Sequence, residues 1–224
     1  MNVDRILSAA PRSRMVRAAL LGLAALVLGS LFLATYAVTV RTLAGQRLDN
    51  GAFVSWQQLN PFLGAFAQVL RPTLPLALGA VCCVLGLGAL RARRVRALVR
   101  ATLVVGITVP VSRWLRDAVL ERPDLADLGY AYNTLPSGHV VASSALCVAV
   151  LLLWPRLSWP LVLWAGGVLL AASIASLLEH AHRPSDVVAS LLLVGTVTCL
   201  VLALTQSPAP RTAGPGNSPG PPSS

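Results

Sequence analysis

Three histidines are the residues of this chain best suited to chemistry: His139, His180 and His182. His139 follows Pro-Ser-Gly at positions 136–138, and His182 opens the segment His-Arg-Pro-Ser-Asp, which places Asp186 four residues later. An imidazole can act as a nucleophile or as a general acid and base near neutral pH, and a neighbouring carboxylate fixes its tautomer and orientation. The sequence therefore predicts that His182 and Asp186 form a catalytic pair and that the histidines share one polar site.

Groups that bind anions surround these histidines in the sequence. Ser137 and Gly138 stand at the expected start of a helix, where free N–H groups and the positive end of the helix dipole attract an anion. Arg116, Arg122 and Arg183 offer guanidinium groups that match the oxygens of a phosphate. Together these groups favour phosphoryl transfer, in which positioning and charge stabilisation carry most of the catalysis.

A metal site is the competing interpretation of the same region. Glu179, His180, His182 and Asp186 could together ligate a cation. The arginines expected in the same place would repel that cation. We therefore expect neither a metal nor another cofactor.

The composition indicates what must hold these residues in place. Hydrophobic residues make up 55% of the 224 residues and charged residues only 12%, whereas soluble domains carry about 25% charged residues. A helix that spans a bilayer needs about 20 predominantly apolar residues. The segments that meet this need cover residues 18–40, 72–90, 101–119, 137–154, 158–178 and 187–205. We predict an all-α, polytopic membrane protein with six transmembrane helices.

The distribution of positive charge predicts the orientation in the membrane. All 18 basic residues are arginines, and the net charge is +10. In a soluble protein this charge would indicate nucleic acid, but here the arginines lie between apolar segments, so we expect membrane lipids and no nucleic acid as partners. The segments richest in arginine are 1–17 and 91–100, which the positive-inside rule places in the cytoplasm. Both termini are then cytoplasmic, and the candidate site faces outward.

The remaining segments complete the expected organisation. Residues 53–70 have a helical apolar pattern, with Pro61 suited to a first turn, and predict a helix lying on the membrane surface or a flap over the site. Residues 207–224 are rich in Pro, Gly and Ser and predict a disordered tail. The expected domains are a cytoplasmic segment 1–17, a membrane domain 18–206 and this tail.

Three motifs in order resemble those of the type 2 phosphatidic acid phosphatases, membrane relatives of the vanadium haloperoxidases. The family pattern is Lys-x6-Arg-Pro, then Pro-Ser-Gly-His, then Ser-Arg-x5-His-x3-Asp. The second motif is intact at 136–139, and His182 and Asp186 complete the end of the third. The first is partial: Arg122-Pro123 matches, and Arg116 lies one residue nearer than the motif's lysine.

The resemblance implies a six-span membrane phosphatase acting on a phosphorylated lipid, with a motif core at about 113–187. By this resemblance His182 is the nucleophile that forms a phosphohistidine, Asp186 orients it, and His139 is the general acid. The phosphate-binding residues are Arg122, Ser137 and Gly138, with Arg116 in place of the lysine. The family needs no metal.

One departure leaves two alternatives open. Ser176 occupies the arginine position of the third motif, and Ala175 occupies its serine position. Arg183 could replace the missing guanidinium, or it could point to solvent or to lipid headgroups. If nothing replaces it, the chain would be a weak or inactive relative that binds phosphorylated lipid as a transport or scaffold subunit.

Overall fold

The computed structural model describes residues 11–58, 61–125, 133–179 and 182–206. Within these residues the chain is helical and contains no strand. The elements are α2 (Pro11–Thr39), α3 (Leu43–Gln57), α4 (Pro61–Arg91), α5 (Val95–Trp114), the π-helical turn η1 (Leu115–Val119), α6 (Gly138–Leu153), α7 (Trp159–Leu178) and α8 (Pro184–Leu204).

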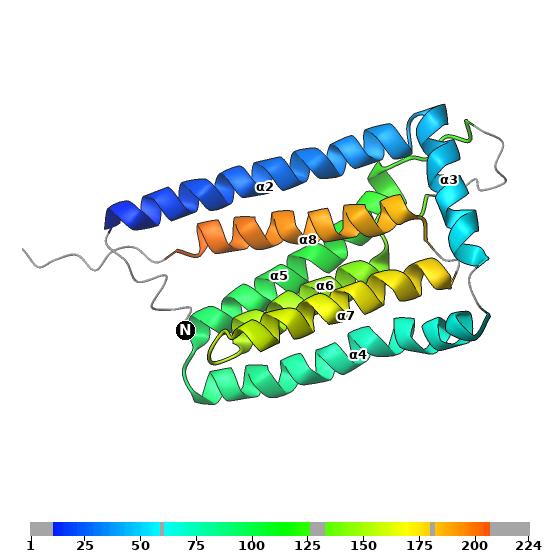
Figure 1. Cartoon of the computed structure of the whole chain (residues 1–224). Coiled ribbons are helices and arrows are strands. Elements are labelled where there is room, and N and C mark those ends of the chain that lie inside the picture. The colour runs from blue at the N-terminus through cyan, green and yellow to red at the C-terminus, as the bar shows by residue number, and fades with distance from the viewer. Residues whose placement is uncertain (1–10, 59–60, 126–132, 180–181, 207–224) are drawn as a thin grey trace, which may run out of the picture.

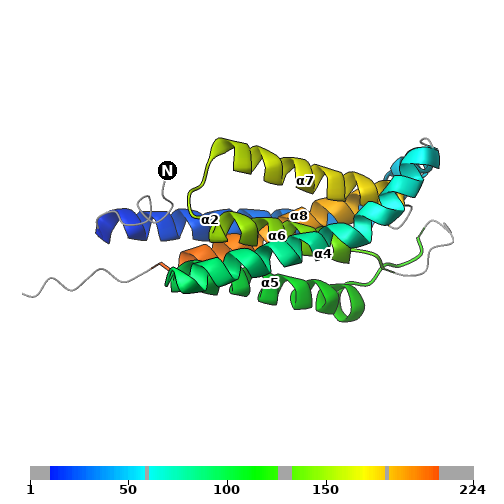
Figure 2. The same cartoon turned by 90° about the horizontal axis from the view of Figure 1, so that it is seen from below.

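The helices form a bundle in which α2 and α4 to α8 lie side by side and alternate in direction (Figures 1 and 2). Helix α6 lies in the middle, in contact with α4, α5, α7 and α8, while α2 packs on α8. Helix α3 crosses one end of the bundle (Figure 1). We call this the α3 end; α6 and α8 begin there, and α7 ends there.

The outward faces of the bundle are apolar. On α2, Leu20, Leu23 and Leu26 are exposed, and on α4 Leu76 and Val84 are exposed. Soluble monomers rarely expose apolar surface on this scale. These faces therefore suit contact with lipid chains, and the protein is a multi-pass membrane protein.

The expected number of membrane spans is approximately matched. Five helices are long and apolar enough to cross a membrane: Arg14–Thr39, Leu63–Arg91, Val95–Val119, Trp159–Leu178 and Pro184–Leu204. The remaining predicted span is α6, which has 16 residues, against the roughly 20 that a full crossing requires. The all-α, polytopic fold class is confirmed, with α6 as a shorter central helix.

A helix begins at Pro61 as predicted, but residues 53–70 do not form one helix on the membrane surface; the alternative of a flap over the site stays a prediction. Residues up to Gln57 belong to α3, and residues from Pro61 belong to α4, which continues through Arg71 to Arg91. The charge of Arg71 ended the apolar segment in the sequence, but Glu179 of α7 forms an ion pair with it, so the helix keeps its charge at low cost. The predicted tail 207–224, like residues 1–10, lies outside the described residues.

Two arginines predicted to set the topology also bind helix C-termini. Arg94 donates to the carbonyls of Leu153 and Trp154 at the end of α6, at 2.8 and 3.1 Å. Arg100 donates to the hydroxyl and carbonyl of Thr205 at the end of α8, at 2.9 and 3.0 Å. Cationic donors satisfy the open carbonyls of a helix C-terminus and its negative dipole end. The loop arginines therefore hold the end of the bundle opposite α3.

Candidate active site

His182 and Asp186 meet at the start of α8. The Nδ1 atom of His182 lies 3.3 Å from Oδ2 of Asp186, which also accepts the backbone N–H of Arg183 at 3.0 Å. Asp186 is fully buried, and His182 is only 7% exposed. Because a carboxylate only accepts, the hydrogen bond requires the ring proton on Nδ1. The Nε2 atom then carries the lone pair, as a nucleophile or base requires.

The start of α6 is fastened to the start of α8. The Ser190 hydroxyl donates to the carbonyl of Asp186 at 2.6 Å and lies 3.2 Å from the carbonyl of Ser137. The N–H of Ser137 donates to the carbonyl of Asp186 at 3.4 Å. Ser137 is fully buried, and its hydroxyl has no hydrogen-bond partner among the described residues. The two intact motifs are therefore side by side, with an unsatisfied hydroxyl between them.

His139 and Arg116 line a cavity of about 450 Å³ between α4, α5 and α6. Gly138 lies in the same wall, and a Cβ atom at this position would lie 3.4 Å from Nη1 of Arg116. Arg116 sits on η1 and donates to Asp117 at 2.8 Å; π-turns are frequent at functional sites. The hydrogen bond from the N–H of Ser137 to the carbonyl of Asp186 holds the start of α6, which carries His139, next to the start of α8, which His182 precedes. The two imidazoles therefore lie at the same end of the bundle.

Asn133 holds η1 against the start of α6. Its side-chain amide donates to the carbonyls of Leu120 at 2.8 Å and Leu135 at 3.0 Å. The N–H of Leu135 donates back to the amide oxygen of Asn133 at 3.1 Å. The segment that carries Arg116 is thereby fixed relative to Gly138.

Arg122 is buried beside an acidic residue that the sequence did not single out. Its side chain is 3% exposed, and Nη2 lies 3.7 Å from Oδ2 of Asp49 on α3. Asp49 also accepts the backbone N–H of Ser185 at 3.0 Å and the Ser185 hydroxyl. In the part of the chain that the structure describes, Nε and Nη2 of Arg122 have no hydrogen-bond partner. Asp49 therefore ties Arg122 to the start of α8 while leaving donors of the guanidinium available.

Burial raises the pKa of Asp49, and the nearby Asp186 adds to this; the hydrogen bonds from Ser185 and the charge of Arg122 oppose it. A carboxyl whose pKa is raised by folding binds its proton more tightly when folded, so its ionisation lowers the free energy of unfolding as pH rises above the ordinary value of 3.8. Asp49→Asn removes this loss. We expect the melting temperature of Asp49→Asn in detergent, relative to the wild type, to rise between about pH 4 and pH 7.

Ser185→Ala is the matched control for that experiment. It removes one donor that lowers the pKa of Asp49 but keeps the carboxylate. Its melting temperature should therefore fall at least as much with rising pH as that of the wild type. If the melting temperatures of Asp49→Asn and the wild type differed by the same amount at every pH, the prediction would be contradicted.

The guanidinium of Arg183 is inside the protein. The residue is 4% exposed. Its Nη1 lies 3.4 Å from the hydroxyl of Thr134, and its guanidinium carbon lies 5.7 Å from the centre of the Phe53 ring of α3, in cation–π geometry. The alternative in which Arg183 points to solvent or to headgroups is therefore wrong.

The site brings together all eight residues that the sequence singled out: His139, His182, Asp186, Arg116, Arg122, Ser137, Gly138 and Arg183. His180 lies outside the described residues. The sequence analysis did not single out Asp49, Thr134 and Arg71, which lie at the α3 end with these residues. Within the described residues no three His, Cys, Asp or Glu side chains converge as metal ligands would.

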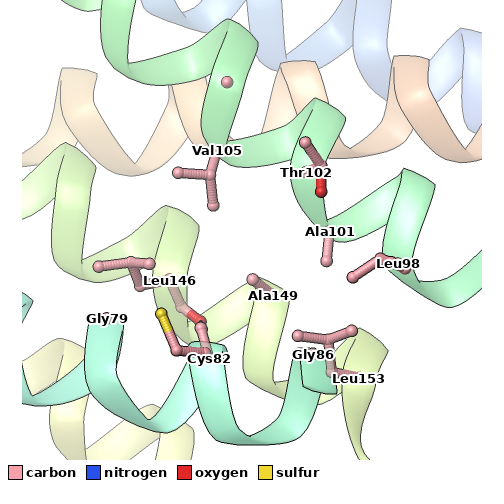
Figure 3. Close-up of a pocket in the computed structure, with 12 residues that line it drawn as sticks. Gly79, Cys82, Gly86, Leu98, Ala101, Thr102, Val105, Leu146, Ala149 and Leu153 are labelled. Carbon is pink, nitrogen blue, oxygen red and sulfur yellow. The ribbon is translucent and has the colours of Figure 1, made fainter. Parts of the chain in front are cut away.

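A second cavity, of about 480 Å³, lies between the same three helices farther from the α3 end. Its walls are apolar and built largely from small residues, including Gly79, Gly86, Ala101 and Ala149 (Figure 3). Both cavities are lined by α4, α5 and α6, so they follow one another along these three helices. The cavity lined by His139 is the polar one, and the second cavity is apolar.

Comparisons with known proteins agree with this arrangement. The family model of the PAP2 superfamily matches residues 76–209. Among solved structures, the chain is similar to the crystal structure of the first transmembrane PAP2 type phosphatidylglycerolphosphate phosphatase from Bacillus subtilis, with a TM-score of 0.66 and 20% identity over 81% of this chain and 95% of that chain. The comparison with curated proteins found no match. The resemblance drawn from the motifs is confirmed, and the chain belongs to the PAP2 superfamily.

Proposed function

We propose that this protein is an integral membrane phosphatase that hydrolyses a phosphate or diphosphate monoester of a lipid. The observation that carries the proposal is a set of buried donors beside His182 and Asp186. Within the described residues, Nε and Nη2 of Arg122 and the hydroxyl of Ser137 have no hydrogen-bond partner, although Nη2 forms an ion pair with Asp49 at 3.7 Å. Leaving such donors unsatisfied is costly. An anionic phosphoryl group bound among them would satisfy them.

The proposed reaction proceeds in two steps. Nε2 of His182 attacks the phosphorus, and the new N–P bond forms as the P–O bond to the lipid breaks. His139 gives its proton to the leaving oxygen. A water then attacks the phosphorus and gives a proton to His139, while the N–P bond breaks and inorganic phosphate leaves.

The remaining site residues have roles in binding. Arg116, Arg122 and Arg183 stabilise the charge of the transferring group. At the start of α6 the hydroxyl of Ser137 and the N–H of Gly138 donate to its oxygens. Asp186 stabilises the imidazolium that develops on His182. Guanidinium groups take the place of a metal ion in this proposal, so the reaction needs no divalent cation.

The apolar cavity supports a lipid as the substrate rather than a small soluble phosphate. Its walls offer hydrocarbon contacts within the same helices that hold His139 and Arg116. The solved relative is, by its title, a phosphatidylglycerolphosphate phosphatase, which supports a phosphorylated lipid as the substrate class.

Phosphate release by the purified protein in detergent tests this function. Phosphatidic acid, phosphatidylglycerolphosphate and a polyprenyl diphosphate are the substrates, each with and without a chelator. We expect release from at least one of them, unaffected by the chelator. Binding of these lipids without release would instead support the alternative of an inactive lipid-binding relative. That alternative is favoured by Ser176, which stands where the family motif has an arginine.

The site is proposed to face outward, with both termini in the cytoplasm, because the arginines gather at the end opposite α3. Glu121 is exposed at the α3 end, and Ala92 is exposed at the opposite end. In a background without the four native cysteines, we expect Glu121→Cys to react with an impermeant thiol reagent in intact cells. Ala92→Cys should react only after permeabilisation; the reverse pattern would invert the topology.

A further inference from the structure

The last turn of α7 lacks a cation where the family motif has one. Ser176 stands at that position and is fully buried, and no described residue forms a hydrogen bond with its hydroxyl. The position therefore faces the interior of the bundle rather than lipid. An arginine there would bring its charge into the site, and serine cannot supply that charge.

Helix α4 brings an arginine to the same turn of α7. Arg71 forms an ion pair through Nη1 with Glu179, which lies three residues after Ser176 and so on the same side of the helix. Ala67 of α4 packs against Ala175 of α7 beside this pair. The guanidinium of Arg71 is thus anchored next to the turn from which the motif's arginine is missing.

Arg71 also lies close to the reacting groups. Pro72, the next residue of α4, lines the cavity that His139 and Arg116 line, and the charge of Arg71 acts on His139. The side chain of Arg71 is 17% exposed, and its buried Nε has no hydrogen-bond partner within the residues that the structure describes. Because the ion pair with Glu179 uses Nη1, other N–H donors of the guanidinium remain for an anion.

We propose that Arg71 supplies from α4 the guanidinium that is missing at Ser176, and that it binds a phosphoryl oxygen of the substrate while Glu179 orients it. This assignment rests on the proposed function. The phosphate site is then formed by five segments: α4, η1, the segment after η1, the start of α6 and the start of α8.

The alternative is that Arg71 only joins α4 to α7. The double variant Arg71→Gln with Glu179→Gln separates the two roles, because the two amides can still hydrogen-bond across the helices without leaving an unpaired charge. If Arg71 binds phosphate, we expect this variant to keep the melting temperature of the wild type within a few degrees. We expect its kcat/KM to fall by roughly 10²-fold or more, as for loss of a charged donor to a transition state.

Moving the guanidinium back to α7 is the second test. Ser176→Arg in the otherwise wild-type chain should change kcat/KM less than about threefold, because the charge is already present. In the Arg71→Gln, Glu179→Gln background, Ser176→Arg should raise kcat/KM at least about tenfold, so the effects of the substitutions are not additive. Arg47→Ala, an exposed arginine of α3 at the same end of the bundle, is the control and should leave the kinetics unchanged.

Calorimetric titration with orthovanadate, which mimics a transferring phosphoryl group, measures phosphate binding by Arg71 without turnover. The Arg71→Gln, Glu179→Gln variant should bind orthovanadate at least about tenfold more weakly than the wild type. Wild-type kinetics together with wild-type vanadate affinity in this variant would overturn the assignment. Failure of the proposed function looks different: the wild type would release no phosphate from any lipid, while its vanadate affinity would still depend on Arg71.

Discussion

Replacement of His182 by alanine is expected to lower kcat/KM by more than about 10⁴-fold, or roughly 5.5 kcal/mol of transition-state stabilisation. Without Nε2 the N–P bond cannot form, and no other imidazole of the described residues is held by a buried carboxylate as His182 is by Asp186. Phosphate release from the best lipid substrate, measured in detergent, gives this number. The melting temperature should change little, because His182 makes a single side-chain hydrogen bond within the described residues.

Labelling of the protein identifies the step that is lost. With a substrate carrying radioactive phosphate, the rapidly quenched wild type should retain acid-labile label, and His182→Ala should retain none. Asp186→Asn is the companion variant. It keeps the shape of the pair but no longer stabilises the imidazolium, so it should retain less label than the wild type and more than His182→Ala. If His182→Ala kept more than about a tenth of the wild-type activity, a difference of under roughly 1.4 kcal/mol, His182 would not be the nucleophile.

The bundle could be predicted from the sequence because its signal is local. Each long helix is an apolar segment bounded by charge, and α6, α7 and α8 begin and end within a few residues of the predicted spans. The prediction failed where a charge inside a helix has a distant partner. Arg71 interrupts the apolar pattern of α4, but Glu179, which neutralises it, follows 108 residues later.

The site could be predicted in part for the same reason. Ser137 to His139 and His182 to Asp186 are short segments in which each residue is fixed by its neighbours, so their types and spacing were informative. Asp49 is different, because its importance comes from Ser185, 136 residues away, and from Arg122. The signal in the sequence was the spacing of Gln46, Asp49 and Phe53, which places two polar residues and an aromatic on the buried face of α3.

Helix α3 changes the interpretation of the loop that precedes α4. Residues 53–70 were expected to form a helix on the membrane surface or a flap over the site, yet Phe53 belongs to α3 and contacts the guanidinium of Arg183. Asp49 of the same helix holds the start of α8. Gln46 donates to the carbonyls of Val40 and Pro123 at 2.8 and 2.6 Å, which joins α3 to the segment that carries Arg122. Substitutions of the buried α3 residues that make these contacts, Gln46, Asp49 and Phe53, should therefore alter phosphate binding through Arg122 and Arg183.

Replacement of His139 by alanine is expected to lower kcat/KM toward a lipid alkyl phosphate by about 10²–10⁴-fold, the range for loss of a general acid. His139 lines the cavity beside Arg116 and Gly138, and the charge of His182 acts on it. In this cavity the leaving oxygen would depart from the phosphorus. An alkoxide is a poor leaving group and needs the proton, whereas the p-nitrophenolate of p-nitrophenyl phosphate departs without one. The same variant should therefore lose less than about tenfold toward p-nitrophenyl phosphate.

The comparison of the two substrates separates the role of His139 from that of His182. Loss of the nucleophile should abolish hydrolysis of both substrates equally, because both require the N–P bond. Loss of the general acid should spare the one whose leaving group is already stable as an anion. If His139→Ala lowered both activities by the same factor, His139 would be acting in binding or in the attack of His182, and protonation of the leaving group would have to come from another donor of the cavity.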